Sequence, residues 1–316
     1  MTTFILRRLL DLGFVLVCVS ILVFLMLRLI PGDAVEIMLG ANTDITPERV
    51  EALRRQLGLH LPVFEQYVRW LGGALRGDLG TSVWTGRPVR EEIWGRLPVT
   101  LEITFLALLF ALVCSFPLGI LAARARGSWS DTVVRTTTVV GLTLPSFWVG
   151  VLLLYAVSVY LPNWPALGYV PFTEDPLGNL SRLALPVFAV ALPMIAGLTR
   201  ILRSSLLEVL NLDYIRTARA KGVAARPLLT KHALRNALIP VVTVIGVQIG
   251  YLLSGVVVIE QVFAIPGLGR LIIGAISERN YPLVQGAILV ITSIFVLVNL
   301  AVDLAYAWID PRVEYT

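Results

Sequence analysis

The chain has 316 residues, of which 57% are hydrophobic and 15% are charged, and its formal net charge at pH 7 is +5. Soluble domains carry about 25% charged residues, so this composition excludes an ordinary water-soluble protein. The basic residues are spread between apolar runs and do not form a separate basic domain, as a nucleic-acid-binding protein would have. We therefore expect a membrane protein that binds no nucleic acid.

The cysteines and histidines show no pattern of redox or metal chemistry. Cys18 and Cys114 both lie inside apolar runs, where a small buried side chain is expected and a disulfide is not. His60 and His232 have no Cys or His neighbours at metal-ligand spacing. We expect neither a metal site nor a catalytic site in this chain.

The N-terminal segment, residues 1–30, has the charge pattern of a signal peptide. Arg7 and Arg8 precede the apolar run Leu9–Ile30, but no small-residue cleavage site follows it. The run is therefore predicted to remain as a membrane anchor.

Residues 31–98 form a long connection of mixed charge with two helical patterns. Thr46 can cap a helix that Gly58 ends, and Pro62–Leu75 has apolar residues at helical spacing. Two interpretations stay open for this outer segment. It is either a pair of amphipathic helices on the outer leaflet or a lid or docking surface over a pore.

Six apolar segments are each long enough to cross the hydrocarbon core, which takes about 20 helical residues. They are Leu9–Ile30, Val99–Ala123, Val133–Leu161, Leu183–Leu202, Leu238–Ile259 and Leu283–Ile309. An open chain in a bilayer satisfies its backbone only as helix. We predict an all-α integral membrane protein with six transmembrane helices, the last five within residues 99–309, and a short tail at 310–316.

The basic residues favour alternate connections and so predict the orientation. They are Arg7 and Arg8 at the start, Arg124, Arg126 and Arg135 after the second span, and Arg200, Arg203, Arg216, Arg219, Lys221, Arg226, Lys231 and Arg235 after the fourth. The opposite short loops hold only Arg182, Arg270 and Arg279. The positive-inside rule then places both termini and the connection 203–237 in the cytoplasm, and the outer segment 31–98 outside.

The connection 203–237 has the pattern of a helix, a turn and a second helix. Apolar and aromatic residues at intervals of four, from Leu206 to Ala218, share one helix face. Gly222 can end this helix in the left-handed conformation, and Pro227 can begin the next one.

Three explanations compete for this charged hairpin. It could bind anionic lipid, its charge could follow only from a cytoplasmic location, or it could dock into a groove of a cytoplasmic partner. Small residues at its tip, Ala218, Ala220 and Gly222, allow a partner surface to approach closely, which lipid binding does not require.

Blocks of sequence along the whole chain carry a family resemblance. The hairpin reads DYIRTARAKG and then HALRNALIP, and the other blocks are RRLLDLGF, LRLIPGDA, LGLHLPVFEQYVRWLGGALRGDLG, TLPSFWVG, VVVIEQVFAIPGLGRLI, RNYPLVQG and NLAVDLAYAWIDPR. Together they resemble the B-type permease subunit of ABC importers of the dipeptide/oligopeptide/nickel branch. Ala218 and Gly222 fit the general importer loop, whereas Arg216 and Thr217 stand where that loop has Glu and Ala, as in the peptide branch.

The resemblance implies a pore-forming subunit of an ATP-driven, binding-protein-dependent importer in a bacterial inner membrane. It implies as partners a second homologous permease subunit, two cytoplasmic ATPase subunits and an extracytoplasmic substrate-binding protein, with membrane lipid around the spans. The chain lacks the G-x-x-x-x-G-K-[ST] motif, so ATP and Mg are expected on the ATPase subunits and no cofactor on this chain. Di- or oligopeptides are the first substrate expectation, with nickel, glutathione-like compounds and oligosaccharides as alternatives.

Two sets of functional residues follow. The expected ATPase-coupling residues are Asp213, Tyr214, Arg216, Thr217, Ala218, Arg219, Ala220, Lys221 and Gly222. Candidates for the translocation path or gate are Pro145, Gln248, Ser254, Glu260, Phe263 and Pro266. The plain alternatives are a static kink at Pro145, close helix packing at Gly246-x-x-x-Gly250 around Gln248, and an interfacial position for Glu260.

Two rival function classes make different predictions. A self-sufficient secondary transporter would have an inverted repeat and membrane-embedded acids, but no convincing repeat is present and Asp11 and Asp303 lie near span ends. An intramembrane enzyme would need a nucleophile motif such as G-x-S-x-G or ligands at membrane depth, and neither is found.

Overall fold

The computed structural model of the chain describes residues 2–29, 48, 51, 54, 55 and 58–309. Over these residues it is built from helices, with one isolated bridge between Thr81 and Pro88. The predicted helix cap at Thr46 and the tail at 310–316 lie outside the described residues. Gly58 has a φ of +70°, and the Leu59 amide donates to the Arg54 carbonyl at 2.9 Å, which is the geometry of a helix end.

The chain divides into two compact units. One comprises Met1–Pro98 and Gly267–Leu297, and the other comprises Val99–Pro266 and Val298–Glu314. Two long helices, α5 (Val89–Arg124) and α13 (Tyr281–Ile309), contribute residues to both units.

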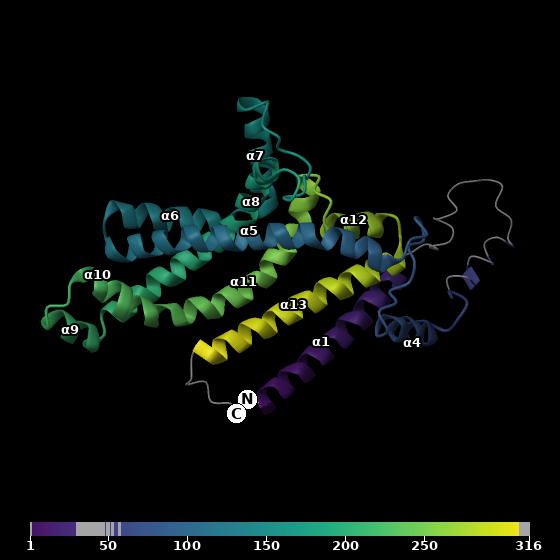
Figure 1. Cartoon of the computed structure of the whole chain (residues 1–316), viewed down its shortest axis with the longest axis horizontal. Coiled ribbons are helices and arrows are strands. Elements are labelled where there is room, and N and C mark those ends of the chain that lie inside the picture. The colour runs from purple at the N-terminus through teal and green to yellow at the C-terminus, as the bar shows by residue number, and fades with distance from the viewer. Residues whose placement is uncertain (1, 30–47, 49–50, 52–53, 56–57, 310–316) are drawn as a thin grey trace. The chain divides into compact units, whose positions relative to one another are not determined.

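The first unit contains α1 (Thr2–Leu29), α4 (Val63–Ala74), the beginning of α5, α12 (Leu268–Ser277) and the beginning of α13 (Figure 1). Its core is formed by aliphatic side chains such as Val89, Ile93, Leu268, Leu283 and Val284. The helix predicted over 62–75 is present as α4.

Helix α4 packs against α1 through aromatic rings. The ring of Tyr67 lies 5.2 Å from that of Phe24 in an edge-on arrangement, and Trp70 lies 6.0 Å from the same ring. Such pairs contribute about 0.5–1.5 kcal/mol beyond area burial. The Tyr67 hydroxyl also shares a hydrogen bond of 2.8 Å with Ser20. This cluster attaches the segment after the first span to the span itself.

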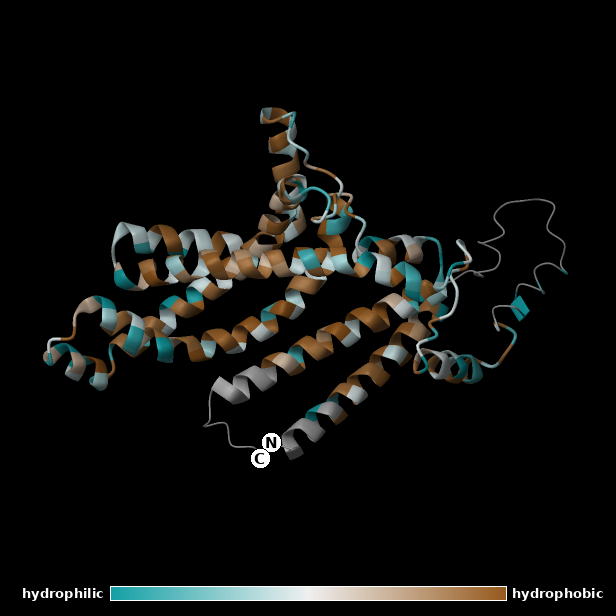
Figure 2. Cartoon of the chain, viewed as in Figure 1, coloured by the Kyte–Doolittle hydropathy of each residue, from teal (hydrophilic) through white to brown (hydrophobic). Residues whose placement is uncertain are grey.

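The second unit is organised around α8 (Pro176–Leu210), whose apolar window is 67% buried inside the protein. Around α8 pack α6 (Trp129–Thr143), α7 (Ser146–Tyr160) and α11 (Leu234–Val262). The hairpin of α9 (Asp213–Ala220) and α10 (Ala225–Pro227) lies at one end of this unit, where Figure 2 shows hydrophilic residues gathered. A six-residue π-helix, η1 (Leu228–Ala233), joins α10 to α11.

Among the described residues, five helices are long and apolar enough to cross a membrane. They are Leu10–Leu29, Val89–Arg124, Pro176–Leu210, Ala225–Val262 and Tyr281–Val302. The bent pair α6 and α7 brings the number to six if it counts as one span. The prediction of an all-α integral membrane protein is confirmed.

The third predicted span, Val133–Leu161, is wrong as a single helix. The structure breaks it after Thr143, and the two halves are bent by 103°. Leu144 precedes a proline and takes an extended conformation, because the proline ring disfavours the helical region for the residue before it. Pro145 is itself extended and directly precedes α7 as its N-cap residue. The half before the break, with Arg135 and four threonines, is more polar than the half after it, but the prediction treated both as one apolar run.

Candidate functional site

Helix α9 is held onto the second unit by one apolar side chain. Ile215 is 0% exposed and belongs to the same core as Leu206, Leu228 and Ala233. The predicted continuous helix from Leu206 to Ala218 is wrong, because α8 ends at Leu210 and α9 begins at Asp213. The break turns Ile215 toward the core in place of its exposed neighbour Tyr214.

Tyr214 fixes the other edge of α9 through polar contacts. Its hydroxyl donates to the backbone carbonyl of His232 at 3.3 Å and accepts a hydrogen bond from the Asn236 amide at 2.7 Å. His232 lies in the π-helix and Asn236 in the first turn of α11. The short helix is therefore tied to the helix that follows it.

The turn after α9 depends on Gly222. Its φ is +81°, the left-handed region that favours glycine, and the amide of Val223 donates to the Ala218 carbonyl at 3.2 Å across the turn. Nothing lies within 4 Å of the position where a Cβ would stand. The second helix begins at Ala225, two residues before Pro227, where the sequence had placed its start.

The outward face of α9 is polar and mainly cationic. Its exposed residues are Asp213, Tyr214, Arg216, Thr217, Arg219, Ala220, Lys221 and Gly222, while Ala218 is half-buried. Asp213 lies in the first turn and Arg219 in the last, which complements the helix dipole. Arg216 reaches Asp213 at 3.3 Å in an exposed ion pair. Helix α9 thus has one face held against the second unit by Ile215, and its charged residues lie on the exposed face.

A buried ion pair that the sequence did not reveal joins α8 to α6 in the same unit. Arg203 on α8 contacts Asp131 on α6 with two parallel hydrogen bonds of 2.7 and 2.8 Å. Asp131 is 2% exposed. Nearby, Ser205 donates to the Ala237 carbonyl of α11 at 3.0 Å. Arg203 counted only as a cytoplasmic charge in the sequence, and Ile215, an apolar residue in the polar stretch DYIRTARA, was not selected.

Two of the six path candidates are completely buried. Glu260 is 0% exposed, in contrast to the interfacial position considered for it, and accepts a hydrogen bond of 2.5 Å from Thr100 of α5. Phe263 is also 0% exposed, and its ring packs where a side chain on Gly150 would otherwise lie. The C-terminal end of α11 thus carries a buried carboxylate, and a buried aromatic ring directly follows it.

The other four candidates have different surroundings. Pro145, Ser254 and Pro266 are exposed, and Pro145 stands at the break between α6 and α7. Gln248 lies against Gly197 of α8, where a Cβ would come within 2.9 Å of its amide nitrogen. The structure therefore does not gather the six residues in one place.

The loop before α8 is held by further polar contacts. Tyr169 donates to Glu102 of α5 at 2.6 Å. Burial, together with this hydrogen bond, raises the pKa of the Tyr169 hydroxyl above its usual value, so it stays a donor at all ordinary pH values. The amide of Gly168 donates to the Phe263 carbonyl at 3.0 Å, which fixes the same loop to the end of α11.

Comparison with known proteins covers the whole chain. The sequence profile of the binding-protein-dependent transport system inner membrane component matches residues 115–315, and the profile of its N-terminal part matches residues 1–104. A putative peptide transport system permease protein of Brucella abortus is 44% identical over 315 residues, with all of both chains covered. The dipeptide transport system permease protein DppB of Escherichia coli K12 is 41% identical over 341 residues, covering 100% of this chain and 99% of DppB.

A solved structure shows the same fold at lower similarity. An amino acid ABC transporter crystallised with histidines has a TM-score of 0.51 at 15% identity, covering 71% of this chain and 95% of the other. This chain belongs to the family of binding-protein-dependent transport system inner membrane components, the multi-pass membrane permeases of ABC transporters.

Proposed function

We propose that the chain is the pore-forming subunit of an ATP-driven importer for di- or oligopeptides. The names of the relatives in Brucella abortus and Escherichia coli, peptide and dipeptide permeases, support this substrate class. A substrate-binding protein outside delivers the peptide, and two ATPase subunits, which bind ATP and Mg, supply the energy. A second, homologous permease subunit completes the pore.

The observation that carries the proposal is the construction of α9. Its Ile215 and Tyr214 attach it to the permease core, while Arg216, Arg219 and Lys221 face outward. An exposed short helix with a firmly held inner face suits insertion into a groove of a partner. ATPase closure displaces α9, and the contacts of Ile215 and Tyr214 pass that displacement to α8 and α11. The lipid and topology explanations account for the charge but not for this anchoring.

Both termini and α9 are placed in the cytoplasm by this proposal. The asymmetry of lysine and arginine between the connections supports this orientation. A reporter domain that is active only in the cytoplasm should be active when it is fused to the C-terminus, and one that is active only outside should be inactive. A cysteine placed at the exposed position of Arg219 should react with a membrane-impermeant thiol reagent only after the membrane is opened.

The decisive experiment is charge reversal on α9 in the assembled transporter. Arg219→Glu should lower both co-purification with the ATPase subunits and ATP-driven peptide uptake. Arg126→Glu, an exposed arginine in the turn between α5 and α6, is the matched control and should change neither. If Arg219→Glu and Arg126→Glu had the same effect on co-purification and uptake, the docking role of α9 would be contradicted. Uptake by the chain alone, driven by a proton or sodium gradient, would contradict the importer itself.

A further inference from the structure

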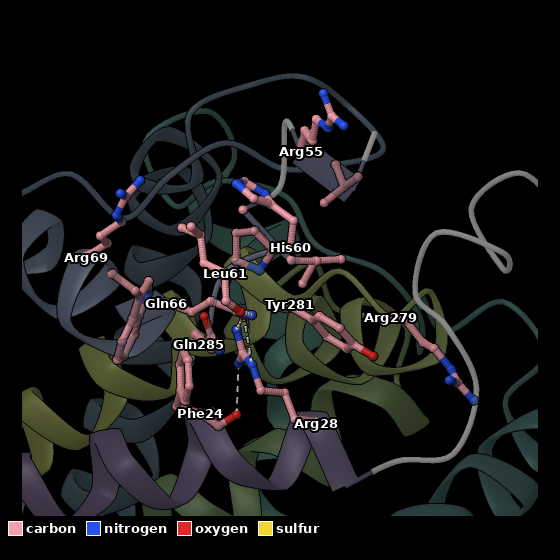
Figure 3. Close-up of a pocket in the computed structure, with 15 residues that line it drawn as sticks. Phe24, Arg28, Arg55, His60, Leu61, Gln66, Arg69, Arg279, Tyr281 and Gln285 are labelled. Atoms are coloured by element: carbon pink, nitrogen blue, oxygen red, sulfur yellow. Dashed lines mark hydrogen bonds between the residues drawn. The ribbon is translucent and has the colours of Figure 1, made fainter. Parts of the chain in front are cut away.

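The first unit holds a cavity of about 340 Å³ where the end of α1 meets α4 and the start of α13. Figure 3 shows Arg28, Gln66, His60, Tyr281 and Gln285 around it. No described acidic side chain lines it. Three further arginines, Arg55, Arg69 and Arg279, stand at its edge and point away from its centre in Figure 3.

Arg28 is the central charge of this cavity. Its guanidinium donates to the Gln66 side-chain oxygen at 3.2 and 2.5 Å and to the Phe24 carbonyl at 3.0 Å. It also lies 3.4 Å above the Phe24 ring. These contacts use three of its five N–H groups, and none of them involves a carboxylate of the described residues. The contacts thus hold the positive charge of Arg28 in place and leave two of its N–H groups for a further acceptor.

Two buried donors beside Arg28 are also unused. Gln285 is 4% exposed, and its side-chain nitrogen has no hydrogen-bond partner among the described residues. The indole nitrogen of Trp70 is buried and is likewise without a partner there. A buried donor left unsatisfied is destabilising, so native proteins generally supply an acceptor. Both residues line the cavity. An acceptor would satisfy both donors, and the positive charge of Arg28 beside them favours an acceptor with negative charge.

The position of the cavity indicates the source of that acceptor. Arg28 is the second-last residue of the apolar stretch Leu10–Leu29, so it lies at the depth where phospholipid phosphates lie. Leu25 and Leu29 of α1 are exposed on the helix face next to that of Arg28, and Phe64 of α4 is 78% exposed. An acyl chain can lie on these side chains while the headgroup enters the cavity.

We propose that this cavity binds the phosphate of an anionic glycerophospholipid, held by Arg28, Gln285 and Trp70. A basic pocket between membrane helices is a recurrent way of binding acidic headgroups. A peptide substrate is disfavoured as the occupant, because its ammonium group would find no described carboxylate in the cavity. The inference concerns a site apart from α9 and holds for either orientation of the chain.

The test is lipid binding to the purified transporter assembly, measured by native mass spectrometry. Phosphatidylglycerol, with a net charge of −1, is the probe, and phosphatidylcholine, whose choline ammonium neutralises its phosphate, is the zwitterionic control of similar size. Arg28→Gln and Gln285→Glu should each weaken phosphatidylglycerol binding roughly tenfold, as expected for loss of one charge-assisted hydrogen bond. Gln285→Glu nearly preserves the side-chain shape and places a competing carboxylate beside Arg28. Arg28→Lys should retain part of the binding.

Arg90→Gln supplies the matched control, since Arg90 is exposed on the same unit outside this cavity. It should bind lipid like the unaltered chain. Equal loss, or equal retention, in Arg28→Gln and Arg90→Gln would overturn the proposal. It would equally be overturned if phosphatidylcholine bound as tightly as phosphatidylglycerol. Displacement of the lipid by inorganic phosphate alone would identify a free anion as the ligand, and displacement by a dipeptide but not by its amide would identify the substrate carboxylate.

Discussion

Arg203 of α8 and Asp131 of α6 form a two-pronged ion pair, with nitrogen–oxygen distances of 2.7 and 2.8 Å, although they are 72 residues apart. The Asp131 carboxylate also accepts the Gly127 amide at 3.0 Å. The pair thus joins two helices and the turn that precedes one of them. Each member of this buried pair is the counter-charge of the other. Loss of either side chain therefore leaves the other charge uncompensated.

Asp131→Asn should lower the free energy of unfolding by about 3 kcal/mol, because it leaves the Arg203 guanidinium without its counter-charge. The double variant Asp131→Asn/Arg203→Gln should be less destabilised than the sum of the single variants. Unfolding of the purified protein in detergent measures both. The exposed pair Asp213–Arg216 is the control, and Asp213→Asn should give no measurable change. Additive single and double variants would contradict the coupling.

Ile215→Ala should release α9 from the second unit, because it removes a fully buried side chain at a typical cost of about 2–5 kcal/mol. Hydrogen exchange of the amides in Asp213–Ala220 should accelerate, while the long helices remain protected. Ile215→Val should cost only about 0.5–1.5 kcal/mol and leave α9 in place. Unchanged exchange in the alanine variant would show that other contacts hold this helix.

Gly222→Ala should destabilise the hairpin by about 1–2 kcal/mol through backbone conformation alone, since the space for a Cβ is open and the φ is positive. Gly222→Asn should be milder, because asparagine tolerates this conformation. The control is Gly72→Ala in α4, which has the same open space without a positive φ and should be neutral or stabilising. Thermal unfolding and exchange of Gly222 neighbours distinguish the three variants.

Thr100→Val should destabilise the second unit by about 1–3 kcal/mol, because the buried Glu260 loses a hydrogen-bond donor while the side-chain shape is kept. Thr100→Ser keeps the donor and should recover most of the loss. Parallel measurements of unfolding and of peptide uptake would separate a purely structural role of Glu260 from a role in transport. Equal stability of the valine and serine variants would contradict the importance of this hydrogen bond.

The sequence predicted the spans well because hydrocarbon thickness imposes a local requirement. The helix end at Gly58 and the turn at Gly222 were also accessible, since glycine acts on its own backbone. The bend at Pro145 was noticed only as a possible kink, because a proline in an apolar run does not show how far the helix bends at it. The pairing of Arg203 with Asp131 depends on how helices pack and leaves no local pattern.

Site residues were predicted unevenly for the same reason. The exposed residues of α9 were selected from a contiguous motif, whereas its anchor Ile215 became visible only when the break at Asn211 set the direction of the helix. Likewise, Arg28 and Gln285 are 257 positions apart, and only the packing of α1 and α13 in one unit brings them to one cavity.

The helix that begins at Ala225, passes through the π-turn at Leu228–Ala233 and ends at Val262 has a mechanical consequence. At 1.5 Å per residue it is roughly 57 Å long, so a tilt of about 5° at one end shifts the other by about 5 Å. One end lies beside α9 and the other carries Glu260 and leads directly to Phe263. If this helix tilts as one body, a displacement of its end beside α9 is accompanied by a shift of about one side chain at the end near Phe263.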